Sequence, residues 1–65
     1  MDEKVTFQYK NITFVLKIRD NTLVYRDEAH LGGPWSDVTK SLNNKSLDSR
    51  FRKALYDASI KFIQL

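Results

Sequence analysis

Between Val5 and Tyr25 the chain alternates apolar and polar side chains with period two, and no other feature constrains the fold as much. Residues two apart on a β-strand point to the same face, so the pattern predicts strands that are apolar on one side. The segment is also rich in β-branched and aromatic residues, which favour strands. We predict strands at about residues 4–10, 12–19 and 22–26.

Two breaks in this pattern, at Lys10-Asn11 and at Asp20-Asn21, predict two-residue turns. Asn and Asp tolerate the positive φ angles that such turns require. Both turns then bring the large apolar side chains to a single face, and a slip of one residue would move one strand's apolar set to the other face. The predicted neighbours on this face are Tyr9–Ile12, Phe7–Phe14, Val5–Leu16, Leu16–Tyr25 and Ile18–Leu23.

The middle of the chain has a weaker pattern. Gly32-Gly33-Pro34 interrupts any regular element, so residues 27–34 are predicted to form a loop. After it, apolar side chains recur at helical spacing and predict a short helix at about residues 35–43. These apolar side chains are Trp35, Val38 and Leu42.

From Ser46 onwards the apolar residues follow the helical period, which predicts a helix at about residues 46–63. Ser46 is a suitable N-cap, and Asp48 would lie in the first turn, where the helix dipole favours an anion. The apolar stripe that would cover the sheet consists of Leu47, Phe51, Ala54, Leu55, Ala58 and Phe62.

These elements predict one α+β domain over residues 1–65, with the arrangement βββαα. A three-stranded antiparallel meander packs on the C-terminal helix, the short helix lies between them, and Trp35 plugs the open end of the core. A chain of this length buries only about 60% of its unfolded surface, so its core is marginal. Without Cys it has no disulfides, and close packing or self-association must supply the support.

The net charge of +3 lies in the predicted helical half, because residues 36–65 carry six basic and three acidic side chains. An excess of this size permits contact with nucleic acid without requiring it. The chain shows no signal-peptide pattern and no apolar run that could span a membrane. With no Cys either, we expect a cytoplasmic protein that does not bind membranes.

Asp27-Glu28-Ala29-His30 spells a magnesium-binding helicase motif, which we interpret as coincidence because no phosphate-binding loop accompanies it. Adjacent strand residues point to opposite faces, so these side chains converge poorly on a metal. His30 is the only His, and no nucleophile elbow surrounds Ser36 or Ser41. A small two-layer domain also seldom has room for a cleft of about 300 Å³. We therefore expect no enzyme activity, no metal and no cofactor.

The helical segment carries more apolar residues than one sheet can cover. Tyr56, Ile60 and Ile63 lie about 150° around the helix from the apolar stripe. One explanation is that the helix ends near Ser59 and that residues 60–65 form a strand or a tail on the core. Another is that scattered apolar residues are simply exposed, which is common. The functional explanation is an interface with another protein or with a second copy.

Other residues could enlarge such an interface. Val15 and Val24 alternate onto the outer face of the predicted sheet and add a smaller apolar surplus. Trp35, beside the glycine-rich loop, is either an interface anchor or the cap of the core, and a marginal core favours the cap.

A basic run at the start of the predicted helix suggests a second kind of surface. Arg50, Arg52 and Lys53 could contact phosphates, although Asp48 and Asp57 break up their field. The full set of candidate nucleic-acid contacts is Arg50, Arg52, Lys53, Lys45, Lys17 and Arg26.

The sequence thus predicts a small non-catalytic protein-binding module, a regulator or inhibitor that occupies a surface of a larger protein and forms a homodimer. Short chains rich in Lys and Asn and without Cys are frequent in phages and bacterial mobile elements, so by association we expect such an origin. The alternative function is a small DNA- or RNA-binding domain that uses the basic helix and the outer sheet face. A third possibility is a structural subunit that only assembles.

Overall fold

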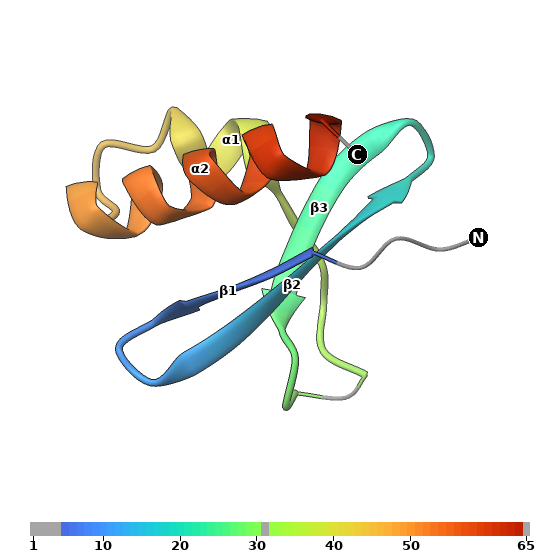
Figure 1. Cartoon of the computed structure of the whole chain (residues 1–65), viewed down its shortest axis with the longest axis horizontal. Coiled ribbons are helices and arrows are strands. Elements are labelled where there is room, and N and C mark those ends of the chain that lie inside the picture. Colours follow the sequence, from blue (N-terminus) through green and yellow to red (C-terminus); the bar gives the residue numbers. More distant parts are fainter. Residues whose placement is uncertain (1–4, 31, 65) are drawn as a thin grey trace.

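The computed structural model describes residues 5–30 and 32–64. It shows a four-stranded antiparallel sheet in the order β1-β2-β3-β4, with both helices on one side (Figure 1). The predicted α+β class, antiparallel sheet and C-terminal helix are confirmed, whereas residue 4 of the first predicted strand lies outside the described residues. The elements are β1 (Val5–Tyr9), β2 (Ile12–Arg19), β3 (Thr22–Asp27), β4 (Ser36–Asp37), α1 (Val38–Leu42) and α2 (Ser49–Gln64).

The predicted register of the first three strands is confirmed. All five predicted cross-strand pairs occur in the sheet. Both turns have two residues with positive φ, at 50° and 66° for Lys10 and Asn11 and at 51° and 62° for Asp20 and Asn21. Asn and Asp side chains reduce the cost of these angles at Asn11, Asp20 and Asn21 but not at Lys10, and the resulting turns match the twist of the flanking strands.

Phe51 of α2 lies at the centre of an aromatic cluster that joins the helix to the sheet. Four rings of the sheet have centroids within 6.0 Å of the Phe51 centroid, those of Phe7, Tyr9, Phe14 and Tyr25. Leu16 from β2 and Leu55 from α2 are fully buried beside this cluster. The helix packs over β1 and β2, and α1 packs over β3.

A fourth strand replaces the start of the predicted short helix. Ser36 and Asp37 pair with Tyr25 and Val24 of β3, so the prediction of three strands is wrong. The Asp37 carboxylate then accepts a hydrogen bond from the Lys40 amide at 3.3 Å. This cap begins α1 at residue 38 rather than at residue 35.

The long helix also begins later than residue 46, because the N-cap is Asp48 and not Ser46. Asp48 Oδ1 accepts the Arg50 amide at 2.8 Å, and the Asp48 carbonyl accepts the Arg52 amide at 3.0 Å. The Ser46 amide instead donates to the side chain of Asn44 at 3.0 Å, in the turn before the helix. At the other end α2 continues to residue 64, so residues 60–64 are helical and form no strand.

Candidate functional site

Tyr56, Ile60 and Ile63 lie about 150° around α2 from the apolar stripe that packs on the sheet, and we call this group of apolar side chains the α2 flank. Spacings of four and three residues place these side chains next to one another on the helix. Tyr56 is 54% exposed and Ile63 is 76% exposed, while Ile60 is half-buried. Phe62 packs against the core. The helix therefore carries apolar side chains on its inner and outer sides.

Two further apolar side chains that sequence reasoning placed over the core are exposed. Ile12 and Ile18 share the helix-facing side of β2 with Leu16, but they are 42% and 53% exposed. Ile12 is the first residue of β2 and Ile18 is the last but one, so both lie near an end of the strand. Alternation identifies the face of a strand residue, but it does not say how far a helix extends over that face.

The outer face of the sheet differs from the expectation, because Val15 and Val24 are only 7% exposed. Their cross-strand partners are Arg26 and Lys17, whose cationic groups lie 4.3 Å and 4.2 Å from the centre of the Trp35 ring. Trp35 and the aliphatic parts of the two basic side chains therefore shelter the valines. Exposed valines and a Trp35 that plugs the core are both wrong expectations.

The candidate nucleic-acid contacts fall into two groups on opposite layers of the domain. Lys17 and Arg26 lie on the outer face of the sheet, against Trp35. The other four residues lie on or just before α2, on the far side of the sheet. Of these four, Lys45, Arg50 and Lys53 are exposed and Arg52 is half-buried. The structure does not bring the six residues together into one surface.

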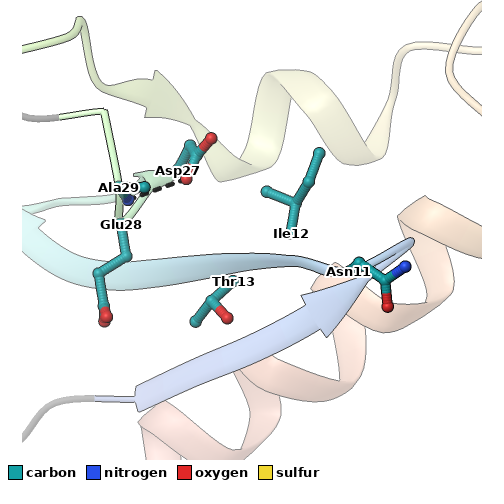
Figure 2. A pocket seen from close by; sticks show the side chains of 6 residues that line it. All are labelled: Asn11, Ile12, Thr13, Asp27, Glu28 and Ala29. Carbon is teal, nitrogen blue, oxygen red and sulfur yellow. Dashed lines mark hydrogen bonds between the residues drawn. The ribbon is translucent and has the colours of Figure 1, made fainter.

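A first hollow of about 380 Å³ lies beside β2 at the point where β3 ends. Figure 2 shows Ile12 and Asp27 on one side of the β2 ribbon and Thr13 and Glu28 on the other. The Glu28 amide donates to the Thr13 carbonyl at 2.8 Å, which closes the end of the sheet. Asn11 and Ala29 complete the lining.

A second hollow of about 360 Å³ lies between the segment after β3 and the start of α2, and we call it the Asp27 hollow. Its polar side chains include His30 and Asp27, and Asp27 also lines the first hollow. Both hollows are open to solvent, and their volumes are comparable to the lower end of the range for small-molecule sites, about 300 Å³. The apolar wall of the Asp27 hollow consists of Phe14, Tyr25, Pro34, Leu47 and Phe51.

The residues of the helicase-like motif have local roles in the turn after β3. Asp27 Oδ1 accepts the Ala29 amide at 2.9 Å, and the Asp27 carbonyl accepts the His30 amide at 3.1 Å. The His30 ring lies so close to Gly33 that a side chain at residue 33 would collide with it. Within residues 5–30 and 32–64, no three His, Asp or Glu side chains gather in a way that could hold a metal ion.

A hydrogen bond from Tyr9 to Asp48 ties the β1–β2 turn to the start of α2. The Tyr9 hydroxyl donates to Asp48 Oδ2 at 2.5 Å. This bond, with the Arg50 amide that also donates to the carboxylate, holds the pKa of Asp48 below its ordinary value. The same bond, together with desolvation of the phenol, raises the pKa of Tyr9. Sequence reasoning missed this pair, since no pattern links residues so far apart.

Comparison with protein-family models, with curated proteins and with solved structures finds no match for the chain. No helix in the described part of the chain is long and apolar enough to cross a membrane.

Proposed function

We propose that the chain is a small, non-catalytic protein-binding module that regulates or inhibits a larger protein by occupying part of its surface. The observation that carries this proposal is the exposure of Tyr56 and Ile63 on a helix whose other side already fills the core. Full burial of one large apolar side chain contributes about 1.5–3 kcal/mol, so covering the α2 flank would be strongly favourable.

A second copy of the chain is the simplest partner for the α2 flank. In a symmetric dimer each copy offers the same patch, so every covered side chain contributes twice. A domain of 65 residues without Cys has few other means of gaining stability. We therefore propose that, where no larger protein covers it, the α2 flank joins two copies of the chain in a homodimer in which the two flanks face each other.

Sedimentation equilibrium over a range of protein concentrations tests the homodimer. We expect dimers in the wild type and monomers in the Ile63→Asp variant, because a charge within the patch would have to be buried. Gln64→Asp is the matched control, since it adds the same charge on the exposed adjacent residue. A wild type that stays monomeric at hundreds of micromolar would refute self-association. Affinity purification from the native host, with wild type and Ile63→Asp compared, then tests the wider proposal of a foreign partner.

Nucleic-acid binding is the second candidate, supported by the exposure of Lys45, Arg50 and Lys53 near the start of α2. If these residues bind phosphates, log affinity for DNA should fall by about 0.9 per contact for each tenfold rise in salt. Replacing all three with Ser should remove this salt dependence. Lys17→Ser is the control, because that residue lies on the other layer against Trp35. Submicromolar affinity at physiological salt would make this the leading function.

A further inference from the structure

We propose that the Asp27 hollow binds an amphipathic organic cation, in which an ammonium or guanidinium group is carried on an apolar body. The hollow is separate from the α2 flank, so this inference stands apart from the proposed function. It rests on three observations. Asp27 lies half-buried beside an aromatic ring, its carboxylate accepts fewer hydrogen bonds than it could, and the wall of the hollow is largely apolar.

The register of the sheet places Asp27 beside an aromatic ring. Asp27 is the direct cross-strand neighbour of Phe14, and both side chains therefore lie on the helix-facing side of the sheet. Both are half-buried, at the end of the sheet that α2 leaves partly uncovered. A carboxylate is thus held against an apolar surface rather than in open solvent.

The Asp27 carboxylate can accept more hydrogen bonds than it does in the described part of the chain. A carboxylate offers about four acceptor positions, and within residues 5–30 and 32–64 the side chain accepts one hydrogen bond, from the Ala29 amide. Arg26, the adjacent cation, also reaches the hollow, but its guanidinium donates to the Gly33 carbonyl at 3.1 Å and stacks on Trp35. A half-buried anion that forms no ion pair with any residue of the described part of the chain favours a ligand that brings the positive charge.

The wall of the hollow suits the apolar part of such a ligand. Phe14, Leu47 and Pro34 line it, together with the edges of the more deeply buried Tyr25 and Phe51. Its volume of about 360 Å³ is within the range of small-molecule sites. A cation close to an aromatic face also gains from the ring quadrupole. The ligand could be a free amine or the Lys or Arg side chain of a peptide, and both share this chemistry.

Titration of ¹⁵N-labelled protein with benzylamine, followed by NMR, tests the proposal. We expect saturable shifts at the amides of Asp27, Ala29, Gly33 and Leu47, with a Kd of about millimolar for so small a ligand. Benzyl alcohol is the neutral isostere and should bind at least about tenfold more weakly, which corresponds to 1.4 kcal/mol. Equal binding of the alcohol and the amine, or no saturable shift with benzylamine, would overturn the proposal.

Asp27→Asn tests the carboxylate itself. The amide oxygen of Asn can still accept the Ala29 amide, so the turn and the fold should persist, and the NMR spectrum checks this. Benzylamine affinity should fall about tenfold or more in Asp27→Asn and stay unchanged in Asp57→Asn, which removes the same charge from an exposed residue of α2. Unchanged affinity in Asp27→Asn would contradict the inference. Parallel titrations with acetyl-Phe-Lys-amide and with its norleucine analogue show whether a peptide side chain is the better ligand.

Discussion

Asp48 has two structural roles that depend on the charge of one side chain. Its Oδ1 atom caps α2 through the Arg50 amide, and its Oδ2 atom accepts the Tyr9 hydroxyl. Asn could serve as a cap almost equally well, whereas the short bond from the phenol favours an ionised acceptor. The choice of Asp at this position therefore serves the contact between helix and hairpin as well as the helix end.

The first prediction concerns the pH dependence of this pair. The pKa of Asp48 is lowered, so its contribution to stability is present above the unfolded value of about 3.9 and is lost as the pH falls through the lower folded pKa. The pKa of Tyr9 is raised, so its contribution is present below about 10 and is lost as the pH rises through the higher folded pKa. The free energy of unfolding of Tyr9→Phe should therefore be lower than that of the wild type between about pH 4 and pH 10. The difference should shrink at lower pH, where Asp48 is protonated, and at higher pH, where Tyr9 is ionised.

Urea denaturation over the pH range measures this difference. Tyr25→Phe is the matched control, because it removes a phenol hydroxyl that is hydrogen-bonded to the neutral hydroxyl of Ser41 at 2.8 Å rather than to a carboxylate. A difference between wild type and Tyr9→Phe that does not change with pH would show that the bond to Asp48 is not the cause.

The second prediction concerns Phe14, whose ring touches both layers of the core. It stacks on Phe7 at 5.1 Å and meets Phe51 edge-on at 5.4 Å. Phe14→Ala should lower the free energy of unfolding by about 3–5 kcal/mol, since the removed ring leaves a cavity in a small core. Ile18→Ala, at a site that is 53% exposed on the same strand, should cost far less. Similar losses in the two variants, measured by chemical denaturation, would contradict this view of the core.

At the scale of elements, the contact between Trp35 and the outer sheet face makes a second packed region. Trp35 precedes β4, and its ring lies against Lys17 of β2 and Arg26 of β3. This contact covers a face that would otherwise expose Val15 and Val24 to solvent. The segment after β3 is thus attached to the sheet by more than the two-residue strand that follows it.

The third prediction is that this contact stabilises the domain. Trp35→Ala should lower the free energy of unfolding by about 2 kcal/mol, from lost apolar burial and two cation–π contacts of about 0.5–1 kcal/mol each. Ser36→Ala is a control on the neighbouring exposed residue. Thermal and urea unfolding, followed by far-UV circular dichroism, give the comparison. An effect within about 0.5 kcal/mol of zero is typical of exposed surface residues and would argue against a packed ring.

The elements that the sequence predicted well are those with a local physical cause. Asn and Asp residues determine the two turns, and the turns determine the register, so β1 to β3 follow from local information. The strand at Ser36 and Asp37 has only two residues, and it forms because β3 offers an open edge. No periodicity reveals such a segment. The same contact moves Trp35 out of the helix that its spacing suggested.

At the scale of the whole molecule, the candidate surfaces were predictable to different degrees. The α2 flank follows from helical geometry, and the structure exposes Tyr56 and Ile63 as that geometry requires. The two valines were misjudged because alternation gives their face but not what lies over it. Neither hollow was predictable, because each forms between segments that are distant in the sequence.

The last prediction joins association to the stability of the whole domain. If the folded chain dimerises through the α2 flank and the unfolded chain does not, mass action makes the midpoint of thermal unfolding rise with protein concentration. We expect this rise for the wild type and for Gln64→Asp, and a constant midpoint for Ile63→Asp. Calorimetry over about a hundredfold range of protein concentration measures the shift of the midpoint. A partner present at a hundred times its Kd stabilises the folded state by about 2.7 kcal/mol, which sets the expected size of the effect.

The Ile63→Asp variant also separates an interface from an internal contact. Ile63 is 76% exposed, so the change leaves the core intact, and the variant should unfold at the midpoint that the wild type approaches on dilution. A variant that is already unfolded at low concentration would instead place Ile63 in the internal core. A wild type whose midpoint does not change with concentration would rule out the homodimer. The α2 flank would then be available to a different protein, because its exposed apolar side chains would still lack a cover in the isolated chain.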